Sequence, residues 1–153
     1  MTRSSKPITI LIAEDDPDDR LLLKDAFDEN RLTNELRFVG NGEELLAYLR
    51  RTGDFADPRN SPAPGLILLD LNMPKMDGRE ALRILKSDPQ LQRIPVVVLT
   101  TSKAEEDIIR TYGLGVSSFI AKPVSFDGLI NVVQVLTSYW IQIVELPPAA
   151  VAA

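Results

Sequence analysis

The chain has 153 residues, 44% of them hydrophobic, which suits a single domain with its own core. It contains no cysteine and no histidine, which excludes disulfides, thiol nucleophiles, thiolate metal sites and imidazole as an acid, base or metal ligand. The formal net charge of -5 and the scattered basic residues argue against nucleic acid as a partner, and no apolar run is long enough for a membrane span. We therefore expect a soluble, cytoplasmic protein whose chemistry depends on carboxylates, hydroxyls and lysine.

The chain begins with a strand-like run and a helical pattern. Residues 8–13 are apolar and end on Glu14, Asp15 and Asp16, and Pro17 follows where a first helical turn would begin. Asp16 is a suitable N-cap for that helix. The predicted buried side of the helix consists of apolar residues at helical spacing: Leu22, Leu23, Ala26 and Phe27.

A second strand and helix follow, and after them comes a segment without periodic pattern. The strand covers residues 36–39, and Asn41 caps the helix. The predicted buried residues of this helix are Leu45, Leu46 and Leu49. Residues 51–65 are rich in Pro, Asp and Asn and are interpreted as an extended surface loop without identifiable chemistry.

The central stretch of the sequence is an apolar run, residues 66–69, that ends on the single carboxylate of Asp70. A buried parallel strand has this pattern, and ligands bind beyond the carboxyl ends of such strands. The alternative role for Asp70 is to cap the following loop. Asp77 and Glu80 resemble a capping box for the next helix. The apolar face of that helix consists of Ala81, Leu82 and Leu85.

Two more strand patterns follow, each ending on a residue that can carry chemistry. The first covers residues 95–99 and leads into Thr100. The second covers residues 118–121 and leads into Lys122. A hydroxyl and an ammonium group are thus predicted at two further strand ends.

Two helix patterns complete the chain. Ser102 opens the first with a capping box, and a last, long helix runs from Ser125 towards Pro147. Neither an internal repeat nor a second domain is apparent. We therefore expect one domain over residues 1–146 and a disordered tail over residues 147–153.

Strands that alternate with helices predict an α/β fold with a parallel, doubly wound sheet, because right-handed crossovers place helices on both faces. The residues that follow the strands then gather at one edge of the sheet. These residues are Glu14, Asp15, Asp16, Asp70, Thr100 and Lys122. Each also has a structural interpretation alone: Asp16 as a helix cap, Thr100 as a strand-end hydroxyl and Lys122 as a solvated charge.

Carboxylates held close together repel one another, by about 1 kcal/mol for a pair at ~4 Å in water and about 4 kcal/mol at an effective dielectric of 20. A divalent cation relieves that repulsion, and oxygen ligands without histidine or cysteine favour Mg²⁺. A carboxylate such as Asp70 can attack phosphorus to give an aspartyl phosphate. Mg²⁺, Lys122 and the Thr100 hydroxyl would stabilise the oxygens of the transferring group.

The acidic cluster after the first strand, the motif DLNMPKMDG at residues 70–78, Thr100 and Lys122-Pro123 together resemble a two-component response-regulator receiver domain. The resemblance covers almost the whole chain. It implies a flavodoxin-like fold with five strands in the order 2-1-3-4-5 and a long C-terminal helix. It also implies that Asp70 is the phosphoacceptor and that the protein signals rather than acting as an enzyme on other substrates.

The resemblance further implies a ligand set and a switch. Asp15 and Asp70 would bind Mg²⁺ through their side chains, Asn72 through its backbone carbonyl, and Glu14 through water. Thr100 and Lys122 would contact the phosphoryl group. Phe119, at the position where several members have tyrosine, would couple to Thr100 sterically. The alternative role for Phe119 is a strand residue packed in the core. The Lys122-Pro123 peptide bond would be cis.

The insert at residues 51–65 and the segments 94–102 and 138–147 are similar to single-domain regulators of cyanobacterial-type phytochrome kinases. This similarity implies a phosphohistidine donor on a light-sensing histidine kinase. The last helix carries two adjacent apolar stripes that together are wider than a surface helix needs. The first, of the kind that covers a sheet, consists of Leu129, Val133, Leu136, Trp140 and Ile143, and the second consists of Val132, Val135 and Tyr139. We therefore predict a homodimer formed through this region, with a fully covered helix or a tucked C-terminus as the alternative.

Two other classes share parts of the pattern. A flavodoxin-like nucleotide- or anion-binding module normally offers glycines and helix N–H groups to a phosphate after its first strand, whereas this chain has acidic residues there. A Mg²⁺-dependent aspartyl-phosphate phosphohydrolase places its nucleophile after the first strand, whereas the candidate nucleophile of this chain, Asp70, follows the central one. Both remain alternatives to the receiver interpretation.

Overall fold

The computed structural model describes residues 8–71, 73, 76, 78–100, 118–121 and 125–136, with the backbone alone for residues 100, 118, 119 and 121. In chain order the described elements are β1 (Thr9–Ala13), α1 (Pro17–Glu29), β2 (Leu36–Val39), α2 (Gly42–Arg50), the 3-10 helices η1 (Gly53–Phe55) and η2 (Pro58–Asn60), β3 (Pro64–Asp70), α3 (Gly78–Ser87), β4 (Val96–Thr100), β5 (Ser118–Ala121) and α5 (Phe126–Leu136). The helix predicted to begin at Ser102 and the predicted tail lie outside the described residues.

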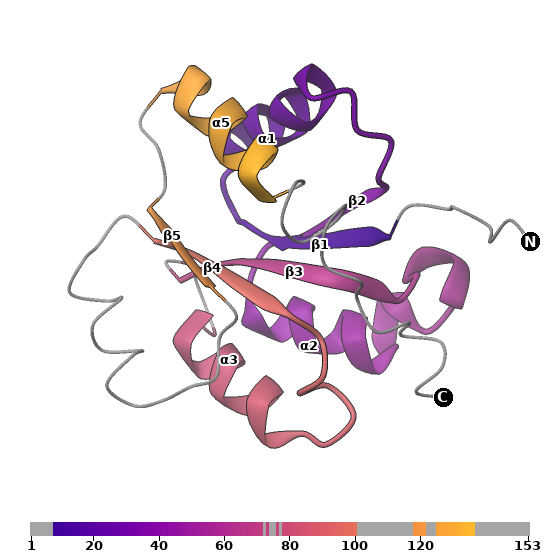
Figure 1. The fold of residues 1–153 in the computed structure, drawn as a ribbon. Coiled ribbons are helices and arrows are strands. Elements are labelled where there is room, and N and C mark those ends of the chain that lie inside the picture. The colour runs from indigo at the N-terminus through magenta and orange to yellow at the C-terminus, as the bar shows by residue number, and fades with distance from the viewer. Residues whose placement is uncertain are drawn as a thin grey trace, which may run out of the picture.

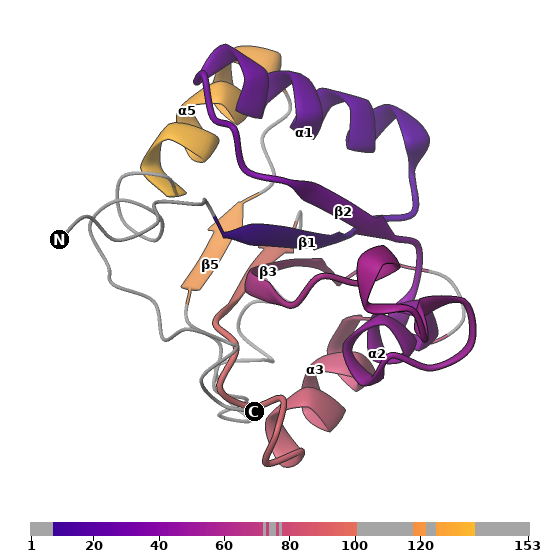
Figure 2. The same cartoon turned by 90° about the vertical axis from the view of Figure 1, so that its right-hand side faces the viewer.

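The strands form a 5-stranded sheet in the order β2-β1-β3-β4-β5, and every neighbouring pair is parallel. Helices α1 and α5 cover one face of the sheet, and α2 and α3 cover the other (Figure 1). Seen from the side, the sheet lies between these two helical layers (Figure 2). The predicted doubly wound, flavodoxin-like α/β fold is confirmed.

Each central strand contributes to two cores, because successive side chains point to opposite faces of a sheet. In β1, Ile10 and Ile12 pack with α1 and α5, whereas Leu11 and Ala13 pack with α2 and α3. All four are almost completely buried. Burial on both faces explains why these strands appear in the sequence as unbroken apolar runs rather than alternating ones.

The helix starts follow the capping residues that the sequence indicates. The Asp16 side chain accepts a hydrogen bond of 2.8 Å from the backbone N–H of Asp18, and Asn41 accepts one of 2.9 Å from Glu44. The Ser125 hydroxyl accepts one of 3.0 Å from Gly128. Each bond satisfies a backbone N–H that the first helical turn leaves without a partner.

The predicted buried stripe of α1 is wrong at one position. Leu23, Ala26 and Phe27 are buried as expected, whereas Leu22 is 40% exposed. Adjacent helix residues point about 100° apart around the helix axis. The side of α1 that packs against the sheet and α5 therefore contains Leu23, whereas Leu22 lies at the edge of that side. The prediction of an extended loop over residues 51–65 is also wrong in part. The segment contains η1 and η2, and its last two residues belong to β3.

The early start of β3 has a local reason. Pro64 pairs with Thr9 of β1 as the first residue of the strand, a position where the missing N–H of proline is tolerated. Gly65 follows where a Cβ atom would lie 2.8 Å from Cβ of Ile8. Proline and glycine usually indicate a turn, whereas Pro64 and Gly65 lie in β3, where they allow it to approach the chain at the start of β1 closely.

Tyr48 of α2 holds the insert between α2 and β3, residues 51–63, against the rest of the domain. Its hydroxyl donates a hydrogen bond of 2.7 Å to the carbonyl of Pro62, and its ring lies 5.2 Å from that of Phe55. The buried Ser61 hydroxyl donates to the Phe55 carbonyl at 2.9 Å. Burial raises the pKa of Tyr48 from 10.0 to about 12, since the phenolate would lose its hydration.

Tyr48→Phe should lower the free energy of unfolding by about 1 kcal/mol at neutral pH, because the Pro62 carbonyl loses its donor. The substitution should also make the free energy of unfolding depend less on pH in the alkaline range. A folded-state pKa raised above the unfolded value of 10.0 gives stability that is present below pH 10.0 and lost as pH rises through about 12. Urea unfolding of both proteins across this range measures the difference, and parallel curves would contradict it.

Candidate functional site

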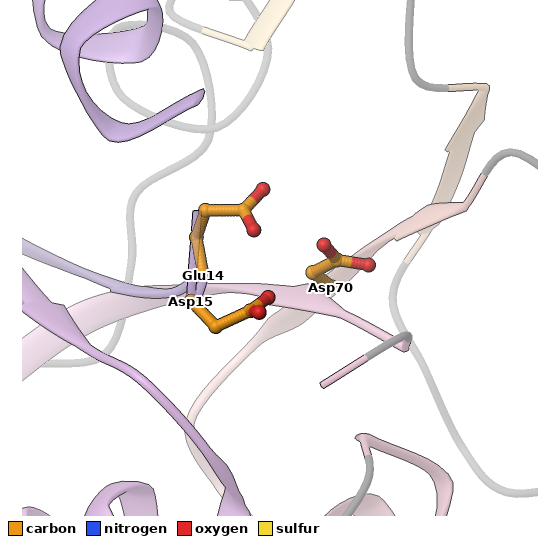
Figure 3. Close-up of side chains that lie close together, drawn as sticks. All are labelled: Glu14, Asp15 and Asp70. Carbon is orange, nitrogen blue, oxygen red and sulfur yellow. The ribbon is translucent and has the colours of Figure 1, made fainter. Parts of the chain in front are cut away.

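The acidic side chains meet because β1 and β3 are neighbours. Ala13 pairs with Leu69, so the next residues on the two strands are Glu14 and Asp70. Asp15 follows in the turn between β1 and α1. One carboxylate oxygen from each of Glu14, Asp15 and Asp70 lies within 4.8 Å of the other two (Figure 3). These three residues are called the acidic triad below.

The acidic triad is partly withdrawn from water. Glu14 is only 1% exposed and Asp70 only 4%, whereas Asp15 is exposed. The backbone N–H of Asp16 donates to Oε2 of Glu14 at 3.3 Å. Like charges at this separation cost about 1 kcal/mol per pair in water and more at a protein surface, so the arrangement favours a positive charge between them.

The donor set of the acidic triad fits a hard divalent cation. Carboxylate oxygens are the ligands that Mg²⁺ and Mn²⁺ prefer, and such ions keep several waters as well. Opposite ligands of Mg²⁺ are about 4 Å apart, twice its bond length, so oxygens spread over 4.8 Å can surround one ion if one of them binds through water. Asp16 is not part of this group, because its side chain caps α1.

The turn after β1 is held from two sides. The backbone N–H of Glu14 donates to the Val39 carbonyl of β2 at 2.9 Å. Nε of Arg20 donates to the Glu14 carbonyl at 2.6 Å, and the guanidinium lies 5.6 Å from the ring centroid of Phe38. No pattern in the sequence distinguishes Arg20, since a single arginine on a helix resembles an ordinary solvated charge.

The segment after β3 depends on two glycines. A Cβ atom at Gly78 would lie 2.6 Å from the carbonyl oxygen of Asp70, and the Gly78 N–H donates to the Leu71 carbonyl at 3.1 Å. The N–H of Gly42, the first residue of α2, donates to the Met76 carbonyl at 2.8 Å, and its Cβ atom would lie 2.7 Å from Met76. Gly78 of the Asp-Gly pair thus marks close packing against Asp70.

The structure describes only some of the other predicted site residues. Thr100 ends β4 and pairs with Ala121, while Asp70 pairs with Leu99, so the backbone of Thr100 lies one residue beyond the level of Asp70. The backbone of Phe119 lies in β5 opposite Val98. Asn72, Lys122 and Pro123, with the predicted cis peptide bond, lie outside the described residues.

Residues 10–134 match the family described as the response regulator receiver domain. The chain therefore belongs to the response-regulator receiver family. This assignment favours the receiver interpretation over the nucleotide-binding and phosphohydrolase alternatives. Among the described residues, no helix is both long and apolar enough to cross a bilayer.

Several similar solved structures are phytochrome or bacteriophytochrome response regulators. The chain is 42% identical over 146 residues to response regulator Rcp1 of Synechocystis sp., covering 95% of this chain and 97% of Rcp1. The crystal structure of the phosphorylated cyanobacterial phytochrome response regulator RcpA matches with a TM-score of 0.83 and 42% identity, over 93% of this chain and 99% of RcpA. The Mn²⁺-bound form of Rcp1 matches with a TM-score of 0.81 and 42% identity, over 93% of this chain and 100% of that structure.

Asp15→Asn should stabilise the metal-free protein by about 1 kcal/mol, because one of three mutually repelling charges is removed. The same variant should lose most of the stabilisation that wild type gains from Mn²⁺, which is about 2.7 kcal/mol at a hundred times Kd. Urea unfolding with and without Mn²⁺ measures both effects.

Asp54→Asn is the matched control, because Asp54 is an exposed carboxylate in η1, on the insert before β3. It should leave the response to Mn²⁺ unchanged. Equal responses of the Asp15 and Asp54 variants would show that the acidic triad does not bind the ion.

Proposed function

We propose that this protein is the phosphoacceptor of a two-component light-signalling system, and that Asp70 takes a phosphoryl group from a phosphohistidine of a histidine kinase. The observation that carries the proposal is the acidic triad at the carboxyl ends of β1 and β3, with Asp70 on the last residue of a buried strand. Membership of the receiver family supports it. The absence of histidine from the chain requires the donor to be another molecule.

In the transfer, a carboxylate oxygen of Asp70 forms a bond to phosphorus as the bond between phosphorus and the kinase imidazole nitrogen breaks. The electron pair of that bond stays on the imidazole, and the product is an acyl phosphate. The side chains of Asp15 and Asp70, the backbone carbonyl of Asn72 and, through water, Glu14 would hold Mg²⁺. When bound, the ion would offset part of the negative charge of the acidic triad and of the incoming phosphoryl group.

Thr100 and Lys122 are proposed as the hydroxyl and ammonium groups that contact the phosphoryl oxygens. The register of β4 supports the position of Thr100, and β5 ends at Ala121, directly before Lys122 in the chain. Phosphorylation replaces a single charge at Asp70 with about two and adds strong acceptors, which would draw these groups closer. A rotamer change of Phe119 would pass that movement to the surface formed near β5.

The partner is proposed to be a phytochrome-type histidine kinase, because the similar proteins Rcp1 and RcpA are, respectively, a response regulator and a phytochrome response regulator. The protein would act in the cytoplasm as a stoichiometric signalling component rather than as an enzyme with repeated turnover. The net charge of -5 supports a role without nucleic acid or anionic membrane surfaces.

Asp70→Asn should abolish labelling when the protein is incubated with Mg²⁺ and a small phosphodonor, because the amide is not a nucleophile. Wild type should gain one phosphoryl group per chain, read by intact mass and by identification of the modified residue. Lys122→Ala should keep some labelling, and Asp54→Asn should label like wild type. Labelling that survives in Asp70→Asn would contradict the assignment, and sustained release of phosphate would favour the phosphohydrolase.

Homodimerisation through the C-terminal helix region is a further part of the proposal. In α5, Leu129, Val133 and Leu136 are buried against the sheet. Val135 is 64% exposed on the same helix, which leaves apolar surface outside the core. A second copy of the chain would cover that surface together with the residues that follow α5.

Val135→Lys should weaken the predicted dimer, because a charge would replace an apolar contact at the proposed interface. Sedimentation at high micromolar concentration, with and without phosphorylation, measures the effect against wild type. Wild type that stays monomeric in both states would remove the dimer from the proposal.

A further inference from the structure

We propose that Arg20 is a positioning residue for the acidic triad, and that its hydrogen bond to the Glu14 carbonyl holds Asp15 where a divalent cation binds. The inference rests on the proposed function, since it assigns a role toward the same metal. It concerns a residue that does not touch the ion and acts through the backbone of the turn after β1. Arg20 lies in α1, six positions after Glu14 along the chain.

The contact between Arg20 and the turn is short and directed. Nε of Arg20 donates to the Glu14 carbonyl at 2.6 Å. That carbonyl belongs to the peptide unit that joins Glu14 to Asp15, and a peptide unit is planar. A bond that fixes the orientation of the unit therefore constrains the Cα positions of Glu14 and Asp15, two of the three residues of the acidic triad.

Asp15 needs such support more than its neighbours do. Glu14 and Asp70 are buried, and their strands are paired on both sides, whereas Asp15 is exposed in the turn. Repulsion from two nearby carboxylates pushes an exposed side chain towards water when no cation is present. The bond from Arg20 opposes that displacement through the main chain, so the turn keeps the geometry that the ion requires.

The guanidinium of Arg20 is itself placed by the end of β2. It lies 5.6 Å from the ring centroid of Phe38, within the range of a cation-π contact. A Cβ atom at Gly40 would lie 3.2 Å from Nη2 of Arg20 and 3.7 Å from a carboxylate oxygen of Glu44. That carboxylate accepts the Gly40 N–H at 2.8 Å, so the guanidinium fits into a space bounded by β2 and the start of α2.

Two substitutions separate the hydrogen bond from the charge. Gln at position 20 places an amide nitrogen at about the reach of Arg Nε, whereas Met places a methyl group there without a donor. Both remove the guanidinium and its contact with Phe38. Arg20→Met should bind Mn²⁺ about tenfold more weakly than wild type, as expected when a group that orients a metal ligand is lost. Arg20→Gln should stay within about threefold of wild type, because the donor is kept.

Lys24→Met is the matched control, because Lys24 is exposed one turn further along α1 and its loss changes the net charge equally. It should bind Mn²⁺ like wild type. Affinities are measured by calorimetric titration of the folded proteins, and urea unfolding without metal is recorded for each. A role in stability alone would shift the unfolding midpoint of Arg20→Met and leave its affinity for Mn²⁺ unchanged.

The outcomes are distinct. Weak binding by Arg20→Met with near-normal binding by Arg20→Gln supports the proposal. Equal affinities of wild type, Arg20→Met and Arg20→Gln overturn it, and so does equal weakening of the two variants, which would assign the effect to the charge or the ring contact. Failure of wild type to bind Mn²⁺, or labelling that persists in Asp70→Asn, would instead contradict the proposed function on which the inference rests.

Discussion

Parallel pairing of β1 with β3 forces three carboxylates together, and this constraint underlies the remaining features of the site. The pairing brings Glu14 beside Asp70 as a direct result of strand register. Both strands are buried on two faces, so the strands cannot move apart to relieve the repulsion without exposing apolar side chains on either side. The cores of the domain thus supply the free energy that keeps like charges close.

The position of this pair in the sheet explains why a ligand can reach it. The chain leaves β1 in one direction to form β2 and returns past β1 to form β3, so α1 and α2 lie on opposite faces of the sheet (Figure 1). Such a change of direction leaves a crevice beyond the carboxyl ends of the two strands. Gly78 and Gly42 then keep the segment after β3 packed closely against Asp70 and α2. Within the acidic triad, Asp15 is exposed to solvent, whereas Glu14 and Asp70 are buried.

The sequence was sufficient for the order of the described strands and α-helices, but not for the 3-10 helices η1 and η2. Buried strands and capped helices depend on local patterns, which is why the Asp70 strand and the caps at Asp16 and Asn41 were predicted correctly. The exposure of Leu22 was missed because it depends on how α1 rotates against its neighbours. Arg20 was missed because its carbonyl partner and the Phe38 ring come together only in the folded chain.

The insert between α2 and β3 has a practical consequence for experiments on this domain. It leads into the first residue of β3, whereas Asp70 is the last residue of the same strand, so the two features lie at opposite ends of β3. Asp54 is exposed there, while Tyr48 and Ser61 fasten the insert to the domain. Because the chain contains no cysteine, a fluorescent dye attached to the single thiol of Asp54→Cys would report tumbling and association of the whole domain without obstructing the acidic triad.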